Sequence, residues 1–215
     1  MKDVYTLDDL VSRSRLDEGA EQPARLAVLG SPVAHSLSPQ LHQAALDETG
    51  TGGRYIRLEV PAGEVSGTLN RLQELEFIGA NITVPHKFEA LSAADEVDGA
   101  ATMLGAVNTI LFERGRKLAF NTDGPGFVRA IHEEFLVDVK DLRIMVVGAG
   151  GGAGGPPPPP DGPNTFILQG PGGISSTTRY LGSILYICIA RGHDVGRRIC
   201  LGFGFIQLGF WFDLV

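Results

Sequence analysis

Short apolar runs alternate with amphipathic stretches along the first part of the chain. RLAVLG (25–30), RYIRLEV (54–60) and GANITV (79–84) are rich in branched apolar residues, as strands usually are. Between them, segments from Ser38 to Thr49 and from Glu64 to Leu75 carry apolar residues at helical spacing. Strand and helix therefore alternate, and this order predicts a parallel sheet with helices packed on its faces.

Capping and turn residues mark the ends of several elements. Ser38 followed by proline offers an N-cap with proline at the first helical position, and Gly50 ends that helix. Farther along, the predicted strands Val107 to Phe112 and Lys117 to Asn121 flank GluArgGlyArg, which indicates a tight connection.

Four further elements complete the prediction. Thr6 and Asp9 have capping-box spacing, so a short helix from about Leu7 to Arg15 is expected within an N-terminal extension that carries no chemistry. We also expect a helix near Lys87, a helix from Gly126 to Phe135, and a buried strand at LRIMVVG.

Charge and composition narrow the possible functions. The net charge is −7, which argues against a nucleic-acid-binding protein. The polar, acidic start lacks the apolar core of a secretory signal, and no apolar run reaches the roughly 18 residues of a membrane helix, so we expect a cytoplasmic protein. Cys188 and Cys200 lack CxxC spacing and the histidines form no HExxH pair, so no metal site is expected.

Two serines lie between a predicted strand end and a helix start. Ser36 and Ser38, in AHSLSP, occupy the position where ligands of α/β folds usually bind, and hydroxyls beside a helix N-terminus suit a carboxylate. A structural alternative stays open, in which Ser38 is only an N-cap and Ser36 a loop residue.

Three polar residues suggest proton transfer and hydroxyl recognition. Lys87, in NITVPHK, could exchange a proton with a substrate hydroxyl if burial lowers its pKa, and Asp123, in NTDG, could orient it. Asn108, in GAVNT, offers a donor and an acceptor for vicinal hydroxyls. The simpler roles are a surface lysine, a helix N-cap and a strand-edge asparagine. We interpret residues 25–123 as a pocket for a small hydroxylated acid.

The joint occurrence of AHSLSP, NITVPHK, GAVNT and NTDG, in this order, resembles the shikimate dehydrogenase family over about residues 25–154. The family reduces 3-dehydroshikimate to shikimate, usually with NADPH. The resemblance implies that Ser36 and Ser38 bind the shikimate carboxylate. It also implies a group around the ring hydroxyls, made up of Thr83, Lys87, Asn108 and Asp123. Within that group Lys87 and Asp123 would be the catalytic pair, and activity on quinate stays possible.

A glycine-rich turn is the candidate cofactor site. VVGAGGGAG follows a strand and satisfies GxGxxA, the turn on which a dinucleotide pyrophosphate rests. The candidate NADP-binding residues are Gly148, Ala149, Gly150, Gly151, Gly152 and Ala153. A helix should follow this turn, but Pro156 to Pro160 forbid it because consecutive prolines hold the backbone extended.

The composition changes after Gly155. From Pro156 onward the chain contains one alanine, no glutamate and no lysine, the residues from which helices are usually made. We hypothesise a shift of the coding frame near Gly155; the alternative is a genuine tail that docks on the first domain or on another subunit. The family's nucleotide-selecting motif and its C-terminal substrate-binding glutamine have no match here, and Gln207 lies in an unrelated setting.

The sequence therefore predicts an α/β protein. It would comprise a three-layer αβα substrate domain with a mostly parallel sheet, an incomplete Rossmann-type start and an atypical tail. The expected divisions are 1–24, 25–124, 125–155 and 156–215. The expected function is NADPH-dependent shikimate dehydrogenase, as monomer or homodimer. The alternatives are a non-catalytic shikimate-binding domain, a quinate/shikimate dehydrogenase, or the product of a damaged gene.

Overall fold

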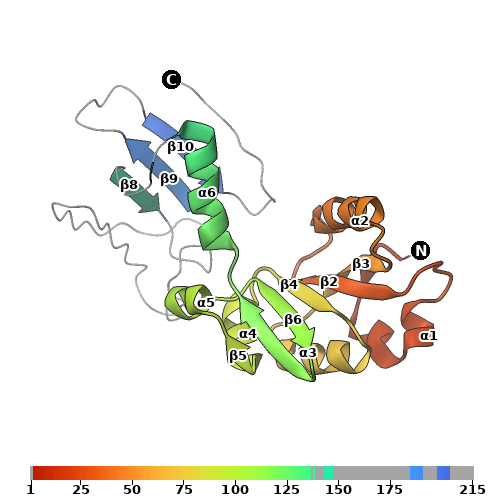
Figure 1. Ribbon diagram of the computed structural model, residues 1–215. Coiled ribbons are helices and arrows are strands. Elements are labelled where there is room, and N and C mark those ends of the chain that lie inside the picture. Colours follow the sequence, from red (N-terminus) through yellow and green to blue (C-terminus); the bar gives the residue numbers. More distant parts are fainter. Residues whose placement is uncertain (1, 137, 139–142, 148–184, 191–197, 204–215) are drawn as a thin grey trace. The chain divides into compact units, whose positions relative to one another are not determined.

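The chain forms two compact units, Met1–Thr122 and Asp123–Val215, and each is described by itself. The computed structural model describes residues 2–136, 138, 143–147, 185–190 and 198–203 (Figure 1). The first unit holds a seven-stranded sheet of order β1-β3-β2-β4-β6-β7-β5 with helices on its faces. This architecture confirms the predicted α/β fold with a mostly parallel sheet.

The seven strands meet in both parallel and antiparallel pairs. They are β1 (Val4–Tyr5), β2 (Ala24–Gly30), β3 (Arg54–Glu59), β4 (Gly79–Ile82), β5 (Glu96–Val97), β6 (Thr109–Glu113) and β7 (Arg116–Phe120). Strand β6 runs antiparallel to both of its neighbours, whereas β1, β3, β2 and β4 pair in parallel. Between β6 and β7, Arg114 and Gly115 have φ values of 51° and 77°, the positive angles that a two-residue hairpin turn requires. The predicted tight connection is confirmed.

Helices lie on both faces of this sheet. They are η1 (Leu7–Val11), α1 (Arg13–Leu16), α2 (Ser38–Thr49), α3 (Val65–Glu74), α4 (Lys87–Ala93) and α5 (Gly99–Leu104). On one face, a small apolar cluster of Val28, Val33 and Tyr55 packs against Leu46 of α2. The larger core lies on the opposite face, where α3 contributes Leu69. The predicted three layers are therefore present, with the short β5 and α5 added to what the pattern indicated.

The residues before β2, which we call the N-terminal segment (Lys2–Pro23), pack into this unit. Its β1 pairs in parallel with β3, and Leu10 and Leu16 are only 2% and 1% exposed. The predicted capping box is present, since Asp9 accepts a hydrogen bond from the Thr6 backbone at 2.7 Å. Burial alone would raise the pKa of Asp9, but hydrogen bonds from Lys2 and Thr6 outweigh that effect and lower the pKa. The segment thus extends both the sheet and the core.

The second unit contains α6 (Asp123–Phe135) and a small sheet of β8 (Arg143–Val147), β9 (Leu185–Ala190) and β10 (Arg198–Phe203). The strand order is β10-β9-β8, and both pairs are antiparallel. This pairing differs from the parallel sheet that follows the first strand of a Rossmann domain. The glycine-rich turn 148–153 and the proline run 156–160 lie outside the described residues, and the division of the chain into domains stays a prediction.

Candidate functional site

The four sequence motifs converge on one edge of the first unit's sheet. AHSLSP follows the carboxyl end of β2, and NITVPHK runs over the carboxyl end of β4. Because β6 is antiparallel, its amino end, where Asn108 lies, is at the same edge, and so is the carboxyl end of β7. In α/β sheets ligands bind outside this edge, so the motifs lie where a binding site is expected.

The β2 and β4 ends approach each other closely at Gly30 and Thr83. A Cβ atom on Gly30 would lie 2.6 Å from the Thr83 methyl carbon, so only glycine fits there without a shift. Backbone hydrogen bonds join the same two segments, from Ser31 N to Val84 O at 3.0 Å and from Thr83 N to Leu29 O at 2.9 Å. The loop after β2 therefore lies directly against the turn after β4.

We call residues 31–38 the serine loop, and its shape differs from the capping arrangement predicted for Ser38. The N-cap of α2 is Leu37, and Ser38 is the first helical residue, so the prediction that Ser38 caps the helix is wrong. Ser38 N donates a hydrogen bond to the Ser36 hydroxyl at 3.3 Å, and this contact orients the serine loop so that Ser38 enters the helix while Leu37 precedes it. Both serines are half-buried, and the Ser38 hydroxyl also bonds to Tyr55.

Three polar side chains of β3 hold the serine loop in place. Glu59 accepts hydrogen bonds from the Ser31 hydroxyl at 2.7 Å and from Val33 N at 2.9 Å. Arg57 donates to the Ser36 carbonyl oxygen at 2.8 Å. With Tyr55, these residues alternate along the strand and so project from the same face. The loop is fixed at its beginning, its middle and its end.

Tyr55 connects this loop to the neighbouring strands. Its phenol donates to Asn81 Oδ1 at 2.6 Å, and its ring stacks on His42 with centroids 4.6 Å apart and planes 5° apart. Burial raises the pKa of Tyr55, while the hydrogen bond with Ser38 acts in the opposite direction. Burial also lowers the pKa of His42, so the stacked imidazole is neutral near pH 7.

The hydrogen-bonded chain continues from Asn81 to Asn108. Asn81 donates to Thr109 Oγ1 at 3.2 Å, and that hydroxyl donates to Asn108 Oδ1 at 3.0 Å. Asn108 is buried, and its amide group donates to Thr122 Oγ1 at 2.9 Å while its Oδ1 accepts from Thr122 N at 3.0 Å. Asn108 therefore also organises the NTDG turn, beyond presenting polar atoms at the sheet edge.

Lys87 is the first residue of α4, and two contacts fix its backbone. The preceding His86 is 1% exposed, and its Nε2 lies 2.8 Å from Val60 O, a bond the Nε2-protonated tautomer donates. The Lys87 carbonyl oxygen accepts from Val107 N at 2.9 Å, which ties α4 to the GAVNT segment. The side chain of Lys87 is half-buried. Asp123 is the first residue of α6 and belongs to the second unit.

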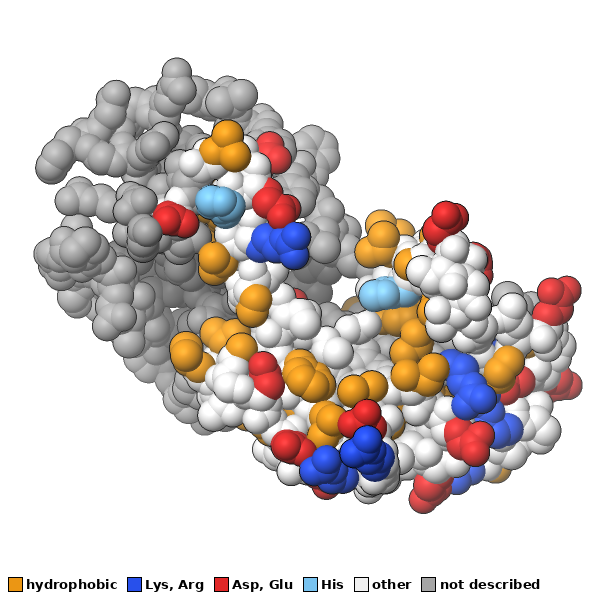
Figure 2. All heavy atoms as spheres, viewed as in Figure 1, with side chains coloured by type: hydrophobic (Ala, Val, Ile, Leu, Met, Phe, Trp, Pro, Cys, Tyr) orange, Lys and Arg blue, Asp and Glu red, His pale blue; other side chains and the backbone are white. Residues whose placement is uncertain are grey.

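Charges of both signs are interspersed over the face of the first unit that Figure 2 shows. Within the described residues, His, Cys, Asp and Glu side chains form no group of three that could hold a metal ion. No described helix is long and apolar enough to cross a membrane. The candidate NADP-binding residues Gly148 to Ala153 lie outside the part of the chain that the structure describes.

The first unit is an α/β domain whose mostly parallel sheet carries polar side chains along one edge. Residues 28–110 match the family model described as the shikimate dehydrogenase substrate binding domain. This part of the chain is therefore similar to the substrate binding domain of shikimate dehydrogenases. The second unit finds no counterpart in that model, whose match ends before it.

Individual relatives agree with this assignment. The chain is 41% identical over 125 residues to a shikimate dehydrogenase (NADP(+)) of Methanopyrus kandleri, a match that covers 58% of this chain and 43% of that protein. Identity is 43% over 124 residues to the corresponding protein of a Geobacillus species, covering 58% and 45%. The chain thus spans less than half the length of these curated relatives.

Solved structures of the family share the fold. A shikimate dehydrogenase crystallised with NADP+ superposes with a TM-score of 0.58 at 39% identity, covering 60% of this chain and 45% of that one. The shikimate 5-dehydrogenase of Thermus thermophilus, in complex with NADP(H) and shikimate, gives a TM-score of 0.53 at 39% identity, covering 61% and 49%.

Sequence reasoning overlooked the residues of β3 and β4 that support the motifs. Tyr55, Arg57 and Glu59 were counted only as parts of a strand, and Asn81 only as part of GANITV. A signal was available, since a strand covered on both faces normally reads as a continuous apolar run. In RYIRLEV, by contrast, Tyr55, Arg57 and Glu59 occupy alternate positions, which indicates that one face of this strand has hydrogen-bonding partners.

Proposed function

We propose that the chain is a shikimate dehydrogenase that reduces 3-dehydroshikimate reversibly to shikimate with NADPH. The observation that carries the proposal is the convergence of the serine loop, Thr83, Lys87 and Asn108 at one sheet edge in a unit that matches the family's substrate binding domain. Polar groups concentrated at such an edge suit a small, densely hydroxylated acid.

Each proposed site residue has a role that fits its chemistry. Ser36 and Ser38 bind the carboxylate of the ligand, beside the N-terminus of the twelve-residue helix α2. Thr83 and Asn108 bind ring hydroxyls. A ligand that lacked one of these hydroxyls would leave polar groups unpaired, at a cost of about 1 to 3 kcal/mol each.

Lys87 and Asp123 form the proposed catalytic pair. In reduction, Lys87 gives a proton to the oxygen of the C3 carbonyl, and Asp123 orients its ammonium group. In the reverse direction, Lys87 takes the proton from the C3 hydroxyl. When bound, NADPH supplies the hydride that reaches the carbonyl carbon, so that the carbonyl is reduced and the nicotinamide is oxidised.

A second candidate function is supported by the strand pairing in the second unit. Strand β8 pairs antiparallel with β9, whereas the first strand of a Rossmann domain lies in a parallel sheet. This observation favours a protein that binds shikimate through its first unit and turns it over slowly or not at all. The site residues would then bind substrate without NADPH.

Two measurements on the full chain distinguish the candidates. Calorimetric titration with shikimate should show saturable binding, with quinate as the comparison ligand and benzoate as a carboxylate that lacks the ring hydroxyls. A spectrophotometric assay of NADPH oxidation with 3-dehydroshikimate then tests turnover. Binding with turnover supports the dehydrogenase, and binding without turnover supports the non-catalytic alternative. Absence of shikimate binding contradicts both.

A further inference from the structure

Two nearly buried arginines of β3 join the N-terminal segment to the sheet. Arg54 and Arg57 are each 8% exposed, and each forms an ion pair with an aspartate of that segment. Because the two arginines are three positions apart on one strand, they project from opposite faces. They therefore offer a pair of arginines that are equally buried but whose aspartate partners differ, since the side chain of Asp17 is 21% exposed and that of Asp3 is 80% exposed.

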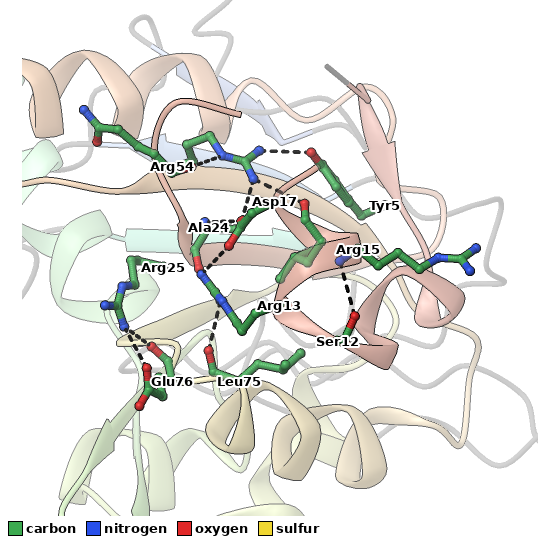
Figure 3. Close-up of polar contacts among 12 residues, drawn as sticks. Tyr5, Ser12, Arg13, Arg15, Asp17, Ala24, Arg25, Arg54, Leu75 and Glu76 are labelled. Atoms are coloured by element: carbon green, nitrogen blue, oxygen red, sulfur yellow. Dashed lines mark hydrogen bonds and ion pairs between the residues drawn. The ribbon is translucent and has the colours of Figure 1, made fainter. Parts of the chain in front are cut away.

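Arg54 bonds to residues of the N-terminal segment. Its guanidinium donates to Tyr5 Oη at 2.9 Å, to Asp17 Oδ1 at 2.8 Å and to the Gln22 carbonyl oxygen at 2.7 Å. Figure 3 shows Arg54 directed toward Tyr5 and Asp17, with Arg13 bonding to the carbonyl groups of Ala24 and Leu75 nearby. This network fastens the N-terminal segment to β3.

The contacts of Arg57 reach the candidate site. Its Nε donates to the Ser36 carbonyl oxygen at 2.8 Å, and its two terminal nitrogens donate to Gln40 Oε1 at 2.9 Å and to Asp3 Oδ1 at 2.7 Å. A guanidinium is planar and its donors have fixed directions, so it sets the spacing between the groups it binds. Arg57 therefore fixes Ser36 relative to both α2 and the N-terminal segment.

Charge gives this contact a second consequence. The two serines are neutral, and Glu59, which bonds to the beginning of the serine loop, carries a negative charge. Arg57 places a positive charge next to Ser36, where the proposed ligand would bring its carboxylate. Its partner Asp3 lies 2.7 Å from the guanidinium, and because the Asp3 side chain is 80% exposed, solvent weakens but does not remove the effect of its negative charge on Arg57.

We infer that Arg57 is a positioning residue for the carboxylate end of the site, and that Asp3 of the N-terminal segment limits the positive potential Arg57 exerts there. This inference rests on the proposed function, since it assigns that site an anionic ligand. It gives the N-terminal segment a role in ligand affinity. If Asp3 merely fastened the segment, its removal would weaken binding or leave it unchanged.

The test compares shikimate affinity among four variants of the full chain by calorimetry. Asp3→Asn should bind shikimate about two- to fivefold more tightly at low ionic strength, and this gain should shrink in higher salt. Arg57→Lys keeps the charge but cannot hold the Ser36, Gln40 and Asp3 acceptors together as the planar guanidinium does, so it should weaken shikimate binding. Arg57→Gln also removes the charge and should weaken binding further, by about tenfold or more. The matched control Asp17→Asn should lower stability and leave affinity unchanged within about twofold.

Amide hydrogen exchange on the ligand-free chain separates this inference from the proposed function. The Ser36 amide bonds to Val33 O at 3.0 Å, and in Arg57→Gln its exchange should accelerate by about tenfold, while Asp17→Asn leaves it unchanged. If the unaltered chain bound no shikimate, the proposed function would fail and this exchange result would decide the positioning role. Weaker or unchanged binding by Asp3→Asn, or equal Ser36 exchange in Arg57→Gln and the unaltered chain, overturns the inference.

Discussion

Tyr55 on β3 donates its phenolic hydrogen to Asn81 on β4 across 2.6 Å, although β2 lies between these two strands in the sheet. The bond passes over the inner strand on the face that carries α2. It joins two parts of the candidate site, namely Ser38, for which we propose carboxylate binding, and Asn108, for which we propose binding of ring hydroxyls. The two ends of the site are therefore joined by side chains rather than by backbone alone.

Tyr55→Phe is expected to destabilise the first unit by about 1 to 2 kcal/mol, because Asn81 Oδ1 and the Ser38 hydroxyl lose a partner while the ring stays in place. Urea unfolding followed by circular dichroism measures the change. Shikimate affinity should also fall, since Ser38 is less constrained. Tyr5→Phe is the control, because the Tyr5 hydroxyl, in the N-terminal segment, accepts a hydrogen bond from Arg54. Equal losses of affinity in both variants would contradict a specific role for Tyr55.

Gly30→Ala should lower the free energy of unfolding by about 1 to 3 kcal/mol, because the added Cβ would lie 2.6 Å from the Thr83 methyl carbon and 3.3 Å from Val84 O. Thermal and urea unfolding report the cost. Gly67→Ala is the control, since Gly67 lies in α3 and an added methyl group there would meet no atom within 4 Å. That variant should be stabilised by up to about 1 kcal/mol. A neutral Gly30→Ala would show that the two strand ends can separate freely.

The stacked His42 should make stability depend on pH. Its pKa in the folded state is lowered from the ordinary 6.5, so below about 6.5 the unfolded chain binds more protons than the folded chain. The stability from this group is therefore fully present above pH 6.5 and is lost as the pH falls toward the folded pKa. His42→Phe keeps a ring against Tyr55 and cannot titrate, so its unfolding free energy should fall less on acidification. Parallel pH profiles in urea unfolding would refute this effect.

Lys87→Ala should reduce turnover by about 10²- to 10⁴-fold, with a much smaller change in shikimate affinity, because the amine acts on the proton that moves in the reaction. Steady-state kinetics and calorimetry measure the two quantities separately. Lys117→Ala is the control, since Lys117 on β7 bonds to Asp95 and Asn70 instead. In an active chain, undiminished turnover by Lys87→Ala would remove Lys87 from the catalytic pair.

The elements that could be predicted are those whose signals are local. The capping box at Thr6 depends on two residues three positions apart, and the Arg114–Gly115 turn depends on adjacent residues. Gly50 ends α2 with a φ of 65°, as a glycine after a helix usually does. Each of these features is complete within a few positions of sequence, so a pattern identifies it without knowledge of the fold.

The support of the site could not be predicted, because it depends on residues that only the fold brings together. Arg57 and Ser36 are 21 positions apart, and Arg57 and Asp3 are 54 apart. Nothing local distinguishes Asp3 from other acidic residues near the start of the chain. The N-cap prediction for α2 was wrong for a related reason, since the geometry of the serine loop makes Leu37 the N-cap although the neighbouring serines are better capping residues.

The pairing of β1 with β3 also matters for anyone who would shorten this protein. The family match begins at residue 28, so a fragment cut to that match would lose β1 and the first four residues of β2, and the outer side of β3 would have no neighbour. An edge strand with unpaired backbone groups can pair with the strand of another molecule. Removal of Leu10 and Leu16 would also expose the apolar residues that they cover in the core. Such a fragment is expected to self-associate, which would be mistaken for native oligomerisation.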